Sequence, residues 1–240
     1  MERKCFYTFV SDNFYDGIGT PKLINSFKKF HPDIELMVYR QDMVNKVFKE
    51  KGLNFDNAKP TFAKLLTDSY DLVVNIDADT IITGRLEEVL KDDYEVGSVL
   101  NLNNWCHAAI ENVTPEMYVQ AGLVASRNKR FWDKWEEANK DAMKYHFYEN
   151  DVLNLVWYND PEVSKMRRKI FDIEKDYYGT KSIGREKEFY IEGDKLMCRN
   201  ERVFCYHNAK GHYMPKLQFD TLGFTPEVVK YFNALTGREI

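Results

Sequence analysis

The sequence lacks the features of a membrane or secreted protein. It contains no apolar run of about 18 residues, so no transmembrane helix is expected. Residues 1–4 lead directly into a strand-like segment, without the apolar core and cleavage site of a signal peptide. The 4 cysteines include no Cys-x-x-Cys pair, which argues against a zinc or redox motif. Their scatter is typical of reduced thiols, so a cytoplasmic location is predicted.

The chain also lacks a strong charge of either sign. Its formal net charge is −4, which argues against a basic surface that binds nucleic acid. Apolar residues make up 44% of the 240 positions, so the chain is expected to be globular rather than disordered. This length suits one large domain, and neither a linker nor an internal repeat is evident. We therefore predict a single domain over residues 1–240, with its oligomeric state left open.

The order of strand-like and helix-like segments predicts an α/β fold. Residues 5–10 and 35–39 have the apolar composition of strands, and 21–30 have the periodicity of a helix between them. This βαβ order is typical of a mostly parallel sheet flanked by helices. Further helices are predicted at 41–51, 61–69, 86–90, 128–145, from 152 onward and at 226–235, and strands at 73–76, 96–100, 118–125 and 203–206. Residues 158–203 are expected to be irregular, with short strands near 188–191.

Two carboxylates follow a mostly apolar stretch at residues 72–76. Val73, Val74 and Ile76 are typical of a buried parallel strand. Asp77 and Asp79 come where that strand ends, and alternate residues of extended chain face the same side. Ligands of open α/β sheets bind outside the carboxyl ends of strands. The pattern therefore predicts a site for Mn²⁺ or Mg²⁺, with a solvated turn as the alternative.

Earlier segments offer groups that could bind a nucleotide. Asp12 follows the first strand and could bond a base or ribose, and Phe14 or Tyr15 could stack on a base. The alternative is that the aromatic side chains of this loop belong to the core. Lys64 precedes the central strand and could reach phosphates or sugar, although a surface lysine is the competing interpretation.

Polar residues also begin a later helix. Glu149, Asn150 and Asp151 precede an apolar helical segment. Acidic groups are favoured at helix starts by capping and by the helix dipole, so a structural role is the strong alternative for Asp151. The functional interpretation is that an acid or amide is presented to a substrate beside the metal.

A second short apolar strand is followed by basic groups. His207 or His212 could be the third metal ligand, and Lys210 could pair with a diphosphate. Gly211 would allow close backbone approach. A single histidine after a strand is more often structural, but the three groups lie within six residues.

These motifs, taken in order, resemble those of the nucleotide-sugar glycosyltransferases of the GT-A fold. Within them the chain is most similar to family 8, which includes glycogenin and the lipopolysaccharide galactosyl- and glucosyltransferases. The resemblance spans residues 4 to about 213. The segments that carry it are the opening strand with Ser11-Asp12-Asn13, Lys64, Asp77-Ala78-Asp79-Thr80, Gln120-Ala121-Gly122-Leu123, Glu149-Asn150-Asp151-Val152-Leu153-Asn154 and His207.

The resemblance implies a separate role for each of three parts of the chain. Residues 1 to about 100 would bind the nucleotide sugar, about 101–215 would form the acceptor side, and 216–240 would be a C-terminal helix. The resemblance places Asp77, Asp79 and His207 on the metal. The resemblance and the residue-based assignments together put Thr8, Asp12, Tyr15, Lys64, Ala78, Gln120, Lys210 and His212 on a donor, expected to be a UDP-sugar. The resemblance puts Glu149, Asn150 and Asp151 near the reacting carbon.

The chain departs from the family pattern at four of these positions. Gln120 replaces asparagine, Lys64 replaces arginine, Glu149 replaces aspartate and Asn150 replaces glutamine. The late His-x-x-Gly-x-x-Lys-Pro-Trp motif is only partly present after His207. Neither the donor sugar nor the stereochemistry follows from these residues.

The sequence thus predicts a metal-dependent hexosyltransferase that acts on a glycan, lipid-linked or protein acceptor, with retention implied by resemblance. For an inverting enzyme, Asp151 would be the general base. One alternative is a catalytically inactive binder of sugar nucleotides or glycans. Another is a phosphohydrolase with an aspartyl nucleophile. That class normally has its motif near the start of the chain and Thr or Val where Ile81 stands here.

Overall fold

The computed structural model describes residues 2–10, 19–51, 58–101, 109–142, 149–171, 186–207 and 223–237. The strands are β1 (Lys4–Val10), β2 (Glu35–Arg40), β3 (Leu72–Ile76), β4 (Thr80–Ile82), β5 (Val96–Leu100), β6 (Val119–Ser126), β7 (Arg168–Ile170), β8 (Phe189–Glu192), β9 (Lys195–Cys198), β10 (Glu201–Arg202) and β11 (Cys205–His207). The helices are α2 (Gly19–Phe30), α3 (Gln41–Lys51), α4 (Lys59–Leu66), α5 (Glu87–Leu90), α6 (Lys129–Ala142), α7 (Glu149–Asn159) and α9 (Pro226–Thr236), with 3-10 turns at Val163–Lys165 and Glu186–Glu188.

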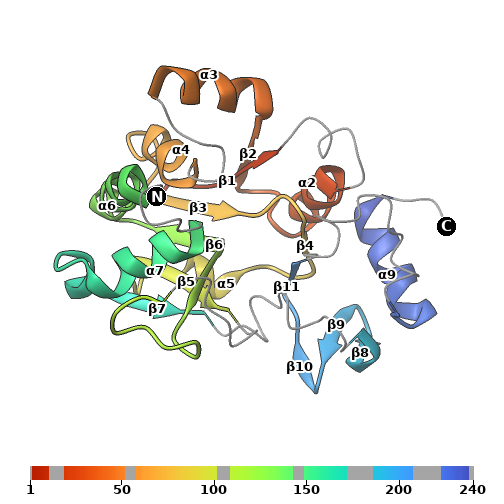
Figure 1. The fold of residues 1–240 in the computed structure, drawn as a ribbon. Helices are drawn as coiled ribbons and strands as arrows, with labels where there is room; N and C mark the ends of the chain where they lie inside the picture. Colours follow the sequence, from red (N-terminus) through yellow and green to blue (C-terminus); the bar gives the residue numbers. More distant parts are fainter. Residues whose placement is uncertain are drawn as a thin grey trace.

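Six strands form the central sheet, in the order β2-β1-β3-β6-β5-β7 (Figure 1). β1 pairs in parallel with β2 and β3, and β5 pairs in parallel with β7. β6 runs antiparallel to both of its neighbours, β3 and β5. All strands of this sheet except β6 therefore point the same way, and the expected mostly parallel α/β architecture is confirmed.

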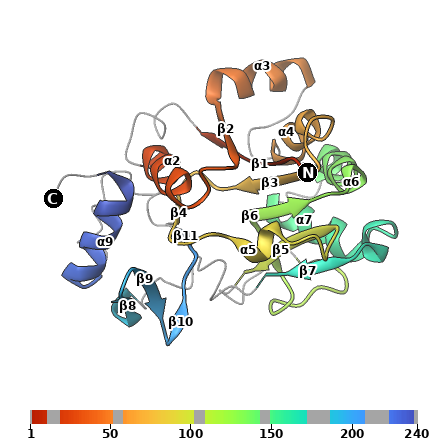
Figure 2. The same cartoon turned by 180° about the vertical axis from the view of Figure 1, so that it is seen from behind.

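Both faces of the sheet are covered, which explains the continuous apolar character of its inner strands. Side chains alternate between the faces. One face packs on α4, α6 and α7, whose apolar core includes Phe62, Trp132 and Trp157. The other packs on α2 and α5, through residues such as Phe27 and Val89. Figure 2 gives the view from behind, with α2 and α5 on the side opposite α4, α6 and α7.

A smaller apolar cluster lies beyond the end of β3. It joins β8, β9 and β11 to α9 through Phe189, Tyr206 and Phe232, and it includes Ile81 of β4. β11 pairs antiparallel with β4, and β8, β9 and β10 form a small antiparallel sheet. The prediction of irregular structure over residues 158–203 was wrong where β7, β9 and β10 form, and the short strand expected near 188–191 is confirmed as β8.

Apart from β4, which was not predicted as a separate strand, the boundaries of the described helices and strands elsewhere agree with the sequence prediction to within a few residues. The helix predicted at 61–69 begins at Lys59 and ends at Leu66. Among the described cysteines, Cys5, Cys198 and Cys205 are buried free thiols, and Cys106 lies outside the described residues. Among the described helices, none combines the length and apolar character needed to cross a membrane.

Candidate metal and donor site

A tight turn places the first two candidate ligands. β3 ends at Ile76, and the backbone N–H of Thr80 donates to the carbonyl of Asp77 at 3.1 Å, which closes the turn. The N–H of Asp77 donates to Gly122 of β6 at 2.9 Å. Asp77 and Asp79 are therefore the first and third residues of this turn, rather than alternate residues of extended chain as expected. The turn nevertheless brings both carboxylates to one point.

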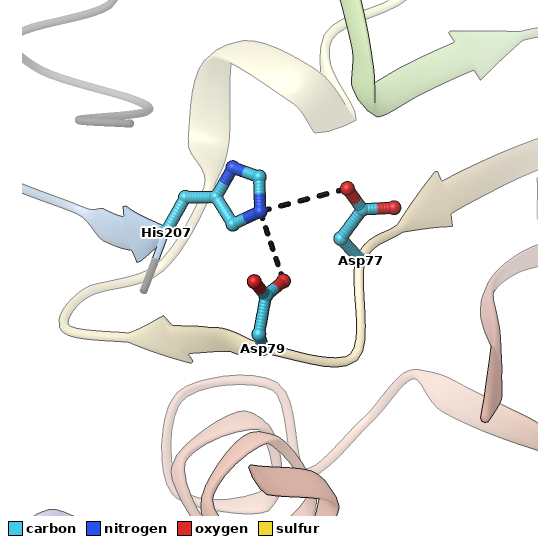
Figure 3. Close-up of side chains that lie close together, drawn as sticks. All are labelled: Asp77, Asp79 and His207. Carbon is cyan, nitrogen blue, oxygen red and sulfur yellow. Dashed lines mark ion pairs between the residues drawn. The ribbon is translucent and has the colours of Figure 1, made fainter. Parts of the chain in front are cut away.

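Strand pairing brings the third ligand from far along the sequence. In the β4–β11 pair, His207 lies opposite Thr80, which follows Asp79 directly. His207 Nε2 lies 2.8 Å from Asp79 Oδ1 and 3.5 Å from Asp77 Oδ2. Figure 3 shows one ring nitrogen of His207 directed toward both carboxylates, and one ligand atom from each residue lies within 4.8 Å of the others.

The chemistry and spacing of this set fit a divalent cation such as Mn²⁺ or Mg²⁺. Carboxylate oxygens are their preferred ligands, and imidazole nitrogen is accepted by the transition metals. Neighbouring ligand atoms on an octahedral ion, at bonds of about 2.1 Å, lie about 3.0 Å apart. The separations of 2.8 and 3.5 Å are close to that value. The three residues would thus occupy part of the coordination shell and leave positions for substrate or water.

The two carboxylates also govern the protonation of His207. Its side chain is only 7% exposed, and this burial by itself opposes a charged ring. The charges of Asp79 and Asp77, with the hydrogen bond to Asp79, outweigh the burial and raise the pKa of His207 above its ordinary value. A cation bound by Asp77 and Asp79 would oppose this protonation, because the ring must be neutral to act as a ligand.

Lys59 lies beside this site, although it was not among the residues predicted from the sequence. Its ammonium is 2.7 Å from Asp77 Oδ1 and 2.5 Å from Glu149 Oε1, and it donates to the carbonyl of Ala121 at 2.9 Å. Burial works against its charge, but Asp77 and Glu149 outweigh this and raise the pKa of Lys59. The lysine therefore joins the end of β3 to the first turn of α7 as a charged group.

Lys64, proposed from the sequence as a contact of the donor sugar, is placed differently. Its ammonium lies 2.9 Å from Asp133 and 2.5 Å from Glu136, both on α6. Lys59, which is five residues earlier and is the first residue of α4, is the lysine that contacts Asp77. A donor contact by Lys64 remains a prediction, and it would require Lys64 to leave its partners on α6.

The first turn of α7 is attached to β6 by hydrogen bonds. Asn150 Oδ1 accepts from the N–H of Ala121 at 2.8 Å. One turn later, Asn154 accepts from the N–H of Val119 at 2.8 Å and donates to its carbonyl at 2.7 Å. Together with the contact from Lys59, which also reaches Asp77, these bonds hold Glu149 near the end of β3.

Asp151 lies deeper than the sequence interpretation requires. Its side chain has no exposed surface, and its Oδ1 accepts from the hydroxyl of Tyr118 at 2.5 Å. This is the environment of a structural carboxylate at a helix start. Its assignment as a general base remains a prediction, one that would need Asp151 to become accessible to an acceptor.

The remaining predicted donor contacts divide into two groups. Thr8 is buried near the carboxyl end of β1, Ala78 is partly exposed between the two aspartates, and Gln120 is buried in β6. These three positions are at the edge of the sheet where Asp77 lies. The others, Asp12, Tyr15, Lys210 and His212, lie outside the described residues.

Comparisons with known proteins identify the fold. No family model matches the sequence, and neither does any curated protein. The galactosyltransferase LgtC, in complex with donor and acceptor sugar analogs, matches with a TM-score of 0.60 at 14% identity, over 97% of this chain and 95% of LgtC. This chain has a glycosyltransferase fold. The GT-A fold expected from the sequence is therefore confirmed.

Two further glycosyltransferases give the same result. The apo form of GlyE from Streptococcus pneumoniae has a TM-score of 0.57 at 13% identity, over 100% of this chain and 61% of GlyE. The apo structure of the bifunctional glycosyltransferase WbbM has a TM-score of 0.55 at 16% identity, over 98% of this chain and 50% of WbbM. The chain thus corresponds in length to LgtC and to about half of WbbM.

Proposed function

We propose that this protein is a metal-dependent glycosyltransferase that moves a hexose from a nucleotide sugar, expected to be a UDP-sugar, to a glycan, lipid-linked or protein acceptor. The observation that carries the proposal is the convergence of Asp77, Asp79 and His207 at the end of β3, within a glycosyltransferase fold. Membership of family 8, and the retention that it implies, is part of the proposal and rests on the sequence motifs.

In this proposal, Asp77, Asp79 and His207 hold Mn²⁺ or Mg²⁺. The ion, when bound, supplies a Lewis acid for the negative charge that develops on the diphosphate leaving group. Thr8, Asp12, Tyr15, Ala78 and Gln120 bind the nucleotide and sugar in this scheme, and Lys64 remains a candidate for the same role. Lys210 and His212 add positive charge near the phosphates.

Glu149 and Asn150 border the reacting side of the sugar in the same proposal. The start of α7 is fixed against β6 by the hydrogen bond between Asn150 and Ala121 and, one turn later, by that between Asn154 and Val119. Glu149 is 20% exposed and faces the end of β3 through Lys59, which suits a group that contacts substrate. Residues 101–118 and 158–200 are proposed to provide the acceptor side.

The test is the effect of Asp79→Ala on binding and turnover. We expect the wild type to gain thermal stability from UDP with Mn²⁺, and the variant to lose most of that gain while it remains folded. Asp71→Ala is a matched control, because Asp71 lies at the opposite end of β3 and accepts from the N–H of Arg3. An unchanged melting shift in Asp79→Ala would contradict the metal assignment.

A panel of nucleotide sugars then separates the proposal from its alternatives. Glycosyl transfer or slow hydrolysis of one donor supports the proposed enzyme and identifies its sugar. Binding without turnover would indicate an inactive sugar-nucleotide binder, and release of phosphate from a phosphomonoester would indicate a phosphohydrolase. The glycosyltransferase fold and the mid-chain position of Asp77 favour the first outcome.

A further inference from the structure

Lys59 is a buried cation placed among acidic groups. Its side chain is 7% exposed, and its ammonium contacts the Asp77 and Glu149 carboxylates and the Ala121 carbonyl. The backbone carbonyl of Lys59 accepts from the buried hydroxyl of Tyr7 at 2.6 Å. The lysine is thus fixed at both its backbone and its side-chain end.

Local structure does not favour a lysine at this position. Lys59 is the first residue of α4, where the helix dipole opposes a positive charge. Lysine is also among the residues that are least often buried. Because both the helix dipole and burial disfavour a lysine at this position, the interactions that favour it must come from other parts of the fold. Here they come from the acidic groups that surround the ammonium.

The lysine divides the two oxygens of Asp77 between two partners. Oδ1 faces the ammonium at 2.7 Å, whereas Oδ2 faces His207 at 3.5 Å. Asp77 is therefore held so that Oδ2, and not Oδ1, is the oxygen directed toward His207. Lys59 contacts none of the other ligands within the described residues, so it would act on a metal through Asp77 and through its charge.

The lysine also sets the charge of the site. Asp77, Asp79 and Glu149 are three carboxylates, and Lys59 is the one lysine or arginine paired with them among the described residues. Counted over these described side chains alone, and with neutral His207, two net negative charges remain, which a divalent cation balances. Without Lys59 there would be three, and the loaded site would stay negative toward an arriving diphosphate.

We propose that Lys59 is a positioning residue that lowers the affinity of this site for a divalent cation alone and raises its affinity for a nucleoside diphosphate once the cation is bound. This inference rests on the proposed function for the identity of the diphosphate. Its physical basis is Coulombic: a fixed positive charge beside the site opposes the cation and attracts the anion. The cation would then be held most firmly when it arrives with the donor.

The test is Lys59→Met, measured in two separate titrations. Free Mn²⁺, followed by its electron paramagnetic resonance signal, should bind the variant more tightly than the wild type, by on the order of tenfold. UDP, titrated calorimetrically with each protein saturated in Mn²⁺, should bind the variant more weakly, by a similar factor. Opposite signs are required, because loss of local structure would weaken both. If both affinities fall together, or neither changes, the inference is overturned.

A second variant covers the case in which Lys59→Met fails to fold. Lys59→Met combined with Glu149→Gln removes one charge of each sign, so the site regains two net negative charges without the lysine. Its Mn²⁺ affinity should return to within about threefold of the wild type if charge is the cause. An affinity that differs from the wild type by tenfold or more in this folded double variant would contradict the inference.

Lys134→Met is the matched control, because Lys134 also bridges two carboxylates, Asp160 and Glu162, on a part of α6 away from the site. It should leave both affinities unchanged. If the wild type binds no Mn²⁺, the metal site and this inference both fall. If the wild type binds Mn²⁺ and UDP with the expected opposite shifts in Lys59→Met, yet turns over no nucleotide sugar, only the proposed enzymatic function fails.

Discussion

Two groups of polar side chains lie near the first residues of β6, and they differ in their exposure and in their partners. Asp77 and Asp79 stay partly exposed, with 27% and 10% of their side chains accessible, and converge on His207. Asp151 and Asn154 of α7 are fully buried, with hydrogen bonds to Tyr118 and to both backbone groups of Val119. In the sequence, all four are polar residues next to an apolar segment.

The difference shows how a binding carboxylate is distinguished from a structural one. In the α7 group, each bond satisfies a polar atom that burial would otherwise leave unpaired, so the group is satisfied within the fold. In the Asp77 group, negative charges are gathered at an accessible point, where Lys59 and His207 offset them in part and a bound cation would offset them further. Changes in the α7 group should therefore affect stability, whereas changes in the Asp77 group should affect binding.

The largest stability effect is expected from Asn154→Ala. This substitution leaves the buried N–H and carbonyl of Val119 without the Asn154 side chain, and we expect a loss of about 3 kcal/mol in unfolding free energy. Urea unfolding measures it, and Mn²⁺ binding by the folded protein should be retained. Asn159→Ala is the control, because Asn159 is on the exposed end of the same helix. Equal stability losses for the two variants would contradict the claim that the buried hydrogen bonds of Asn154 stabilise the fold.

The two described histidines extend the contrast to pH dependence. His31 is 1% exposed and its Nε2 accepts from the N–H of Leu86 at 3.1 Å. Burial, together with the charge of Arg85, lowers the pKa of His31 to about 4. The unfolded chain, with an ordinary pKa near 6.5, binds the proton first as pH falls, so stability is lost between about pH 6.5 and 4, by up to about 3 kcal/mol.

The measurement is urea unfolding across that pH range for the wild type and His31→Gln. The wild type should lose stability more steeply, by up to about 1.4 kcal/mol per pH unit, because only the wild type gains a proton at this position on unfolding. Parallel profiles would show that His31 is not the titrating group. His207, whose pKa is shifted the opposite way, should not contribute to this loss.

The smallest effect is expected from Asp151→Asn. The amide oxygen of asparagine can still accept from Tyr118, so the loss should be about 1 kcal/mol, in part from the weaker interaction with the start of α7. Transfer activity on an active donor should stay near normal, unlike that of Asp79→Ala. If activity falls a hundredfold or more in a folded Asp151→Asn protein, Asp151 acts on substrate and the division between the two groups is wrong.

The elements that the sequence predicted well are those with a strong local signal. β1, β3 and β6 are mostly apolar runs, which composition located, and α2 has a regular apolar face, which periodicity located. β7 was missed because it is a short edge strand of charged and exposed residues, Arg168–Ile170, with the appearance of a surface segment. β4 was not recognised as a separate strand, because its pairing with β11 joins residues more than a hundred positions apart.

The site shows the same limit. Asp77 and Asp79 lie two positions apart in the sequence and were predicted as ligands, and His207 was one of two histidines offered for the third position. Lys59 was missed, because a lysine before a proline at a helix start has the pattern of an exposed residue. The available signal was its position in the first turn of α4, where the helix dipole disfavours a cation.

The reversed direction of β6 determines where the connection between β5 and β6 lies. Because β5 points the same way as β3, Leu100 ends at the edge of the sheet where Asp77 lies, and β6 starts again from that edge at Val119. The connection between them therefore leaves and returns beside the candidate site. A change in the length of this connection would leave the register of the strands unaltered, so the surroundings of the candidate site can vary while β3 and the turn that carries Asp77 and Asp79 stay the same.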